Sequence, residues 1–90
     1  MPSLTIQALK SIRPLLVADV EMCGSQLFRI SNLKSGTTYP ILDRLEREGI
    51  LASRWEDGSH AELRRPLRRY YRITPAGAKL AKQTLEELGV

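Results

Sequence analysis

The sequence predicts a mostly α-helical domain with one small β-hairpin. Two patterns predict this class. Residues 34–51 repeat apolar side chains at helical spacing and include a glycine stop, and residues 51–56 and 68–73 change to the period of two that is typical of strands. The chain has 90 residues, which fits one domain over residues 1–90.

The composition indicates a soluble protein with an anionic partner. The net charge is +4 and the isoelectric point is about 9.6, which suits a polyanion. Cys23 is the single cysteine, so no intramolecular disulfide can form, and we expect a cytoplasmic location. No apolar run approaches the ~20 residues of a membrane span and the N-terminus has no signal-peptide pattern, so we expect no membrane partner.

The first predicted helix covers residues 4–12. Its apolar side chains recur every four residues at Leu4, Ala8 and Ile12. Pro14 is expected to end or bend this helix, because the residue before a proline is pushed out of the α region. The apolar run 15–20 stays open between a short strand and a second piece of helix, and we favour helix or turn.

Two helices joined by a polar turn are predicted next. Ser25, which follows the break at Gly24, is expected to cap a short helix that runs through Ile30. Residues 32–35 form the turn, and the second helix covers residues 35–48. Helix, short turn and helix is the helix-turn-helix arrangement, in which the first helix braces the second.

The helix over residues 35–48 is a candidate recognition helix. We expect Ser35 to be its N-cap and Gly49 its left-handed stop. Its buried stripe comprises Thr38, Leu42 and Leu45, and its opposite face comprises Thr37, Pro40 and Arg44. This outer face is small at its N-terminal end and cationic further on, which suits the major groove of B-DNA, roughly 12 Å wide. Pro40 is expected in the first turn, where no intrahelical bond needs its N–H.

Two strands and a long loop form a predicted wing. Residues 51–56 and 68–73 pair most simply as an antiparallel hairpin. The connection 57–67 is longer than the ~2–5 residues of a plain hairpin loop, and loops of this length are usually functional or disordered. Trp55 lies on a strand face, where an aromatic side chain is usually part of a core or an interface.

Five arginines crowd the far side of this loop and the returning strand: Arg64, Arg65, Arg68, Arg69 and Arg72. We expect the basic wing, residues 57–69, to bind the phosphate backbone, because each cation that meets a phosphate releases condensed counterions. The alternative is a solvated edge that discourages strand aggregation. Arg69 shares a face with Tyr71 and Ile73, so the preferred phosphate contacts are Arg64, Arg65 and Arg68.

The last predicted helix begins at Thr74 and Pro75, a cap followed by a proline at the first helical position. It ends near Gly89, and its apolar stripe comprises Leu80, Ala81, Leu85 and Leu88. Helix, helix, recognition helix, basic hairpin and closing helix together describe a winged helix-turn-helix.

Two motifs carry a more specific signal. The first reads SGTTYPILDRLEREGIL from Ser35, and the second reads RRYYRITPAGAKLA from Arg68. They resemble the PadR family of bacterial transcriptional regulators, whose pattern is Gly-Thr-x-Tyr-Pro-x-Leu-x-x-Leu-Glu-x-x-Gly and then Tyr-Tyr-x-x-Thr-x-x-Gly. The matching positions are Gly36, Thr37, Tyr39, Pro40, Leu42, Leu45, Glu46, Gly49, Tyr70, Tyr71, Thr74 and Gly77.

The resemblance implies a dimeric DNA-binding repressor with Thr37, Tyr39 and Pro40 at or near the DNA. The sequence departs from the family at residues 23–25, which read Cys-Gly-Ser where His-Gly-Tyr is common. The sequence also stops at Val90, so we expect a short form that lacks the usual C-terminal dimerisation region.

We predict DNA contacts from the recognition helix and the wing. Thr37 is the base-edge candidate, and Lys34 is expected to contact a phosphate. Arg44 can reach guanine, or only the backbone. Tyr39 lies between the two helix faces, so its ring can pack on the body while its hydroxyl reaches a phosphate. The predicted DNA-binding residues are Lys34, Ser35, Thr37, Tyr39, Pro40, Arg44, Arg64, Arg65 and Arg68.

A homodimer is expected from the two terminal helices, because a small domain cannot cover apolar stripes at both ends. The predicted interface residues are Leu4, Ala8, Ile12, Leu80, Leu85 and Leu88. Such a dimer sets two recognition helices about one DNA turn apart, roughly 34 Å, so we expect an inverted-repeat operator on double-stranded DNA.

Other functional classes find little support. The sequence has no Ser/His/Asp or Cys/His set and no phosphate-binding loop, so we expect neither an enzyme nor a cofactor. His60 has no second histidine or cysteine to complete a metal site, and Cys23 is expected to be a small buried apolar residue. A small-molecule effector is left open without support. The alternative function is a winged-helix adaptor that binds proteins and not specific DNA, although an adaptor would not need a basic wing.

Overall fold

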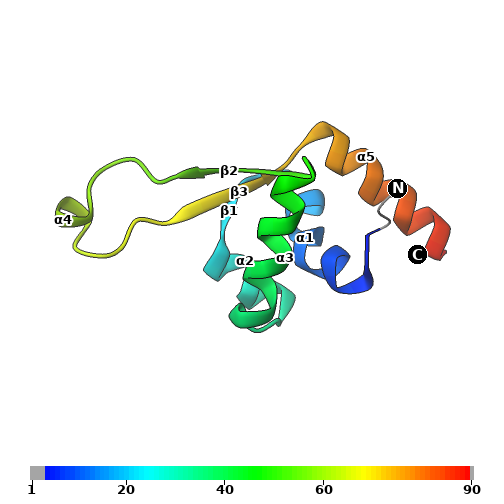
Figure 1. Cartoon of the computed structure of the whole chain (residues 1–90), viewed down its shortest axis with the longest axis horizontal. Helices are drawn as coiled ribbons and strands as arrows, with labels where there is room; N and C mark the ends of the chain where they lie inside the picture. Colours follow the sequence, from blue (N-terminus) through cyan, green and yellow to red (C-terminus); the bar gives the residue numbers. More distant parts are fainter. Residues whose placement is uncertain (1–3, 90) are drawn as a thin grey trace.

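The computed structural model describes residues 4–89, apart from the side chain of His60, so the prediction about a metal site at His60 lies outside the described residues. Over this range the chain forms five helices and a three-stranded antiparallel sheet, which confirms the predicted winged helix-turn-helix class. Figure 1 shows a helical body from which one long hairpin extends along the longest axis, which measures 47 Å against 24 and 22 Å.

The first helix, α1 (Ile6–Ala18), continues through Pro14 to Ala18. The prediction that the helix ends before this proline is therefore wrong. Pro14 has no N–H to donate to the carbonyl of Lys10, four residues earlier. The hydroxyl of Ser31, the last residue of α2 (Gly24–Ser31), donates to that carbonyl instead, at 2.9 Å. A neighbouring helix therefore satisfies the acceptor that the proline leaves open.

The start of α2 differs from the prediction. The side chain of Gln26 accepts the N–H of Cys23 at 3.0 Å, so Cys23 is the N-cap and the choice of Ser25 is wrong. Cys23 also belongs to a strand that the sequence did not predict, β1 (Met22–Cys23). Two residues are too few to show a period, so this strand leaves no pattern in the sequence.

The third helix, α3 (Ser35–Arg47), has Lys34 as its N-cap, which corrects the assignment of Ser35. The carbonyl of Lys34 accepts the N–H of Thr38 at 3.0 Å and the hydroxyl of the same residue at 2.9 Å. Pro40 is therefore the sixth residue of the helix and lies beyond the first turn, contrary to expectation. Its missing N–H leaves one carbonyl of the exposed first turn without an intrahelical partner.

The buried side and the C-terminal end of α3 agree with the prediction. Thr38, Leu42 and Leu45 are each 0% exposed. Gly49 adopts a left-handed conformation, with φ of +78°. This glycine turns the chain directly into the hairpin, so the end of α3 and the base of the wing lie next to each other.

The hairpin strands are β2 (Leu51–Trp55) and β3 (Arg69–Ile73), and they pair antiparallel as predicted. Their register joins Leu51 to Ile73, Ser53 to Tyr71 and Trp55 to Arg69. β3 lies between β1 and β2 and buries Tyr71 in the core. The connecting loop contains a short helix, α4 (His60–Leu63), which lies at the far tip of the wing (Figure 1).

The last helix, α5 (Pro75–Leu88), starts as predicted, with the Thr74 side chain accepting the N–H of Gly77 at 2.9 Å. Gly89 is its C-cap and is left-handed, with φ of +75°. Figure 1 places α5 at the end of the molecule opposite α4. Within residues 4–89 no helix combines the length and the apolar character needed to cross a bilayer.

The core of the single chain includes three side chains of the predicted dimer interface, one from just before α1 and two from α1 itself. Leu4, Ala8 and Ile12 are 7%, 0% and 0% exposed, because this side of α1 packs against α2, α3 and β3. They have almost no free surface for a second copy, so that part of the prediction is corrected. On α5, Leu80 and Leu85 are half-buried, whereas Leu88 is 51% exposed.

Candidate nucleic-acid interface

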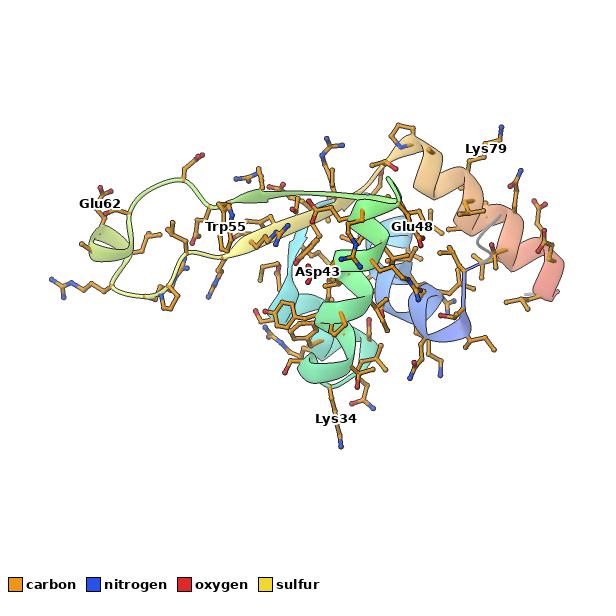
Figure 2. The ribbon with its side chains drawn as sticks, in the orientation of Figure 1. Lys34, Asp43, Glu48, Trp55, Glu62 and Lys79 are labelled. Carbon is orange, nitrogen blue, oxygen red and sulfur yellow. The ribbon has the colours of Figure 1, made fainter. Side chains whose placement is uncertain are left out.

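The outer face of α3 is open to solvent. Lys34, Ser35, Thr37, Pro40 and Arg44 are all exposed. Figure 2 shows the Lys34 side chain extending away from the N-terminal end of α3. Arg44 lies 4.0 Å from Glu48 one turn later, a contact between partly exposed groups that leaves its guanidinium accessible. The small residues of the first two turns therefore lie between a cation at the N-cap and a cation further along the helix.

Tyr39 has the intermediate position that its place on the helical wheel suggests. Its ring packs edge-on against Phe28 of α2, with ring centroids 4.6 Å apart, and the residue remains half-exposed. A Cβ atom on Gly24 would lie 3.1 Å from the Tyr39 hydroxyl. Glycine at the start of α2 therefore leaves the space in which the tyrosine sits, which explains a small residue at this position.

One of the three predicted phosphate contacts of the wing is already paired within the chain. The guanidinium of Arg65 donates to both carboxylate oxygens of Glu56, at 2.7 and 2.8 Å. The backbone N–H of Arg68 also donates to Glu56, at 3.2 Å, and the Glu56 N–H donates to the Arg68 carbonyl at 2.8 Å. Arg65 therefore joins the two sides of the wing, whereas Arg64 and Arg68 are exposed.

The closure at Glu56 predicts a specific pH dependence. The hydrogen bonds from Arg65 lower the pKa of Glu56 from 4.5 to about 2. Because the folded-state pKa lies below the unfolded value, the pair stabilises the wing fully above about pH 4.5 and loses this effect as the pH falls toward 2. We expect an NMR titration to find the Glu56 carboxyl near 2, and Arg65→Gln to return it toward 4.5. An unshifted Glu56 in the wild type would contradict this closure.

A cavity of about 510 Å³ lies between the N-terminus of α2, α3 and the base of the wing. Tyr39 and Arg68 both line it, so the structure brings these two predicted DNA-binding residues together. Asp43 lines the same cavity and is exposed, and the sequence reasoning missed it. An aspartate can accept a hydrogen bond from the amino group of cytosine, and its charge repels phosphate. Asp43 follows Tyr39 by four residues, and this helical spacing could have predicted that the two side chains lie on the same side of α3.

Cys23 also lines this cavity, although the residue is almost fully buried. Burial alone would raise the pKa of its thiol, but contacts with Ser25 and Gln26 and the charge of Arg68 lower that pKa overall. Arg68 is far from Cys23 in sequence, so only the fold brings this cation near the thiol. Among the described residues, no group of three or more histidine, cysteine or acidic side chains is arranged to hold a metal ion.

A second surface feature lies at the opposite end of the molecule. An apolar groove of about 480 Å³ separates α1 from α5 and is lined by Ile6, Leu9, Leu16, Leu85 and Leu88, with Lys10 and Arg13 of α1 also lining it. Ile6 is 62% exposed, so the apolar surface continues onto the outside of α1. Glu86 and Glu87, near the end of α5, are exposed. The groove thus combines apolar side chains of both helices with two cations of α1.

Comparison with known families identifies one match. The model of the transcriptional regulator PadR-like family matches residues 21–83, which include α2, α3, the whole wing and most of α5. A comparison of the sequence with curated proteins gives no match. The matched segment contains every predicted DNA-binding residue.

Solved structures share the fold. The PcaV transcriptional regulator from Streptomyces coelicolor, in complex with its natural ligand, is similar with a TM-score of 0.80 and 17% identity, over 97% of this chain and 57% of that one. A PadR family transcriptional regulator from Eggerthella lenta is similar with a TM-score of 0.75 and 24% identity, over 92% of this chain and 71% of that one. A MarR variant from E. coli complexed with operator DNA is similar with a TM-score of 0.73 and 16% identity, over 96% of this chain and 56% of that one. This chain therefore spans little more than half the length of the first and the third.

Proposed function

Because this chain belongs to the PadR-like family of transcriptional regulators, we propose that it binds a specific site on double-stranded DNA and acts as a cytoplasmic repressor that blocks promoter access. The observation that carries the proposal is the pairing of an exposed recognition helix with a basic wing on either side of one cavity. The MarR variant complexed with operator DNA, which shares the fold, supports it.

In this proposal α3 enters the major groove with its N-terminal turns. Thr37 contacts a base edge, and Lys34 and Tyr39 contact phosphates beside it, since phosphate contacts position a protein and base contacts specify the site. The small side chains around Pro40 allow close approach, and Arg44 reaches the backbone or a guanine further along. The wing binds the flanking backbone through Arg64 and Arg68, while Arg65 holds the wing closed.

We further propose a homodimer that forms through the groove between α1 and α5. The groove of one copy takes Leu88 and its neighbours from the other copy, and the exposed Glu86 and Glu87 meet Lys10 and Arg13. Such a contact is self-complementary, as a two-fold interface requires. It places the wings at the outer ends of the dimer and the recognition helices between them, which suits an inverted-repeat operator.

Binding to duplex DNA measured against salt concentration tests the proposed function. We expect the logarithm of the binding constant to fall steeply with the logarithm of salt concentration, by about 0.9 for each phosphate contacted. Arg64→Ala combined with Arg68→Ala should reduce this slope by about two contacts per chain and weaken binding to operator and random DNA alike. Thr37→Ala should mainly narrow the difference between operator and random DNA, by up to about tenfold.

The matched control for the wing is Lys79→Ala combined with Lys82→Ala, which removes the same charge from exposed positions on α5. Figure 2 shows Lys79 at the end of the molecule remote from the wing. This control should leave the salt slope nearly unchanged. Absence of duplex binding by the wild type at low salt would refute the proposal and favour a protein-binding adaptor.

A further inference from the structure

Arg69 is the wing arginine that points toward the body. Its Nη2 donates to Oε1 of Glu46 at 2.6 Å, and its Nε donates to Oγ of Ser53 at 2.9 Å. Ser53 in turn donates to Oε2 of Glu46 at 2.7 Å. The three side chains form a closed triangle in which both carboxylate oxygens are used. They come from three elements: Glu46 from α3, Ser53 from β2 and Arg69 from β3.

Two aromatic rings hold the guanidinium of Arg69 in place. Its central carbon lies 5.5 Å from the centroid of the Tyr71 ring and 5.7 Å from that of Trp55. Both distances allow a cation–π interaction. The Arg69 and Glu46 side chains are 34% and 29% exposed, so solvent screens the pair less than an open surface ion pair. Four side chains, those of Glu46, Ser53, Trp55 and Tyr71, therefore orientate Arg69 toward the body.

The triangle lies at the point where the wing leaves the body. The pair Trp55 and Arg69 is the last register pair of the β2–β3 ladder. Glu46 belongs to the last turn of α3, so the triangle connects the recognition helix to the end of the β2–β3 ladder, where the connecting loop begins. A lysine could not replace this arrangement, because the planar fork of arginine makes both contacts at once.

We infer that Arg69 is a positioning residue that sets the angle between the recognition helix and the wing, so that both can contact one operator together. This inference rests on the proposed DNA binding. We assign Arg69 this role and not a phosphate contact, because its Nη2 and Nε donate to Glu46 and Ser53. Holding two reading elements in fixed relation lowers the entropy cost of binding a site that requires both. Binding to random DNA does not require both elements to contact one specific site, so a fixed angle between them changes that affinity little.

The test compares Arg69→Gln and Arg69→Lys with Arg68→Gln, a neighbouring wing arginine whose side chain is exposed. Affinity is measured for a duplex selected from a random pool with the wild type, and for random duplex, over a range of salt concentrations. We expect both Arg69 variants to lose about tenfold in affinity for the selected duplex. Their affinity for random DNA should stay within about twofold of the wild-type value. Their salt slope should stay within about half a unit of the wild-type slope. Arg68→Gln should weaken both affinities and lower the slope by about 0.9.

A second measurement without DNA checks that the triangle is present. Trp55 is the single tryptophan, and its emission should change in Arg69→Gln and in Glu46→Gln because the charge beside the indole is lost or moves. Thermal unfolding identifies any variant that fails to fold. In that case Glu46→Gln, which nearly preserves the shape of the side chain, replaces it in the DNA assay, with the same expected loss of affinity for the selected duplex.

Three outcomes would overturn the inference. The first is an Arg69→Lys protein that discriminates as well as the wild type, and the second is an Arg69→Gln protein whose salt slope falls like that of Arg68→Gln. The third is Trp55 emission unchanged in both triangle variants. Each of these leaves the proposed function intact if the wild type binds DNA. A wild type that binds no duplex at low salt overturns the function itself and, with it, the purpose assigned to Arg69.

Discussion

Gly77→Ala is expected to destabilise the fold by about 3 kcal/mol or more, a large part of the roughly 5–15 kcal/mol of a typical domain. A Cβ atom at this position would lie 2.2 Å from the carbonyl oxygen of Ile50. That oxygen cannot move aside easily, because it also accepts the N–H of Thr74 at 3.0 Å and the hydroxyl of the same residue at 3.1 Å. The close approach joins the start of α5 to the base of the wing.

Chemical unfolding of the free protein measures this effect. The matched control is Gly36→Ala in α3, where an added Cβ meets no atom within 4 Å. This second change should stabilise the protein by roughly 0.5–1 kcal/mol, because alanine favours a helix more than glycine does. Equal effects of the two substitutions would show that the contact with Ile50 is not what requires glycine at residue 77.

Ile12→Ala is expected to cost about 2–5 kcal/mol of stability in the single chain, independent of protein concentration. The side chain is fully buried within one chain, so its removal leaves a cavity that the neighbours fill only in part. Urea unfolding at two protein concentrations measures this. A loss of unfolding free energy that appears only at concentrations where the protein associates would show that Ile12 belongs to the dimer interface.

Leu88→Glu is the contrasting change, because Leu88 is 51% exposed beside the groove between α1 and α5. We expect it to weaken self-association in sedimentation experiments by tenfold or more and to change the stability of the monomer little. A dimer that is indifferent to Leu88→Glu would place the interface elsewhere. A wild type that stays monomeric and binds DNA one-to-one would refute the dimer.

The candidate site was predicted best where local sequence determines which way a side chain points. On α3, helical periodicity placed Thr38 in the core and Thr37 outside, and the structure agrees. Alternation in β3 separated Arg69 from Arg68, and the structure turns Arg69 toward the body. The pairing of Arg65 with Glu56 could not be predicted, because Glu56 lies across the wing and no local pattern shows a pair that forms between the two sides of a loop.

The sequence by itself determined the winged helix-turn-helix and the family, because helical and strand periods, the Thr74–Pro75 start and the stop at Gly49 are local signals that survive in any packing. Only the tertiary structure decided which apolar side of α1 forms the core, since a periodic stripe packs equally well against its own chain or a second copy. It also decided the course of α1 through Pro14, because the hydroxyl that satisfies the open carbonyl comes from Ser31 of another helix. Contacts between residues distant in sequence leave no period, so they are visible only once the chain is folded.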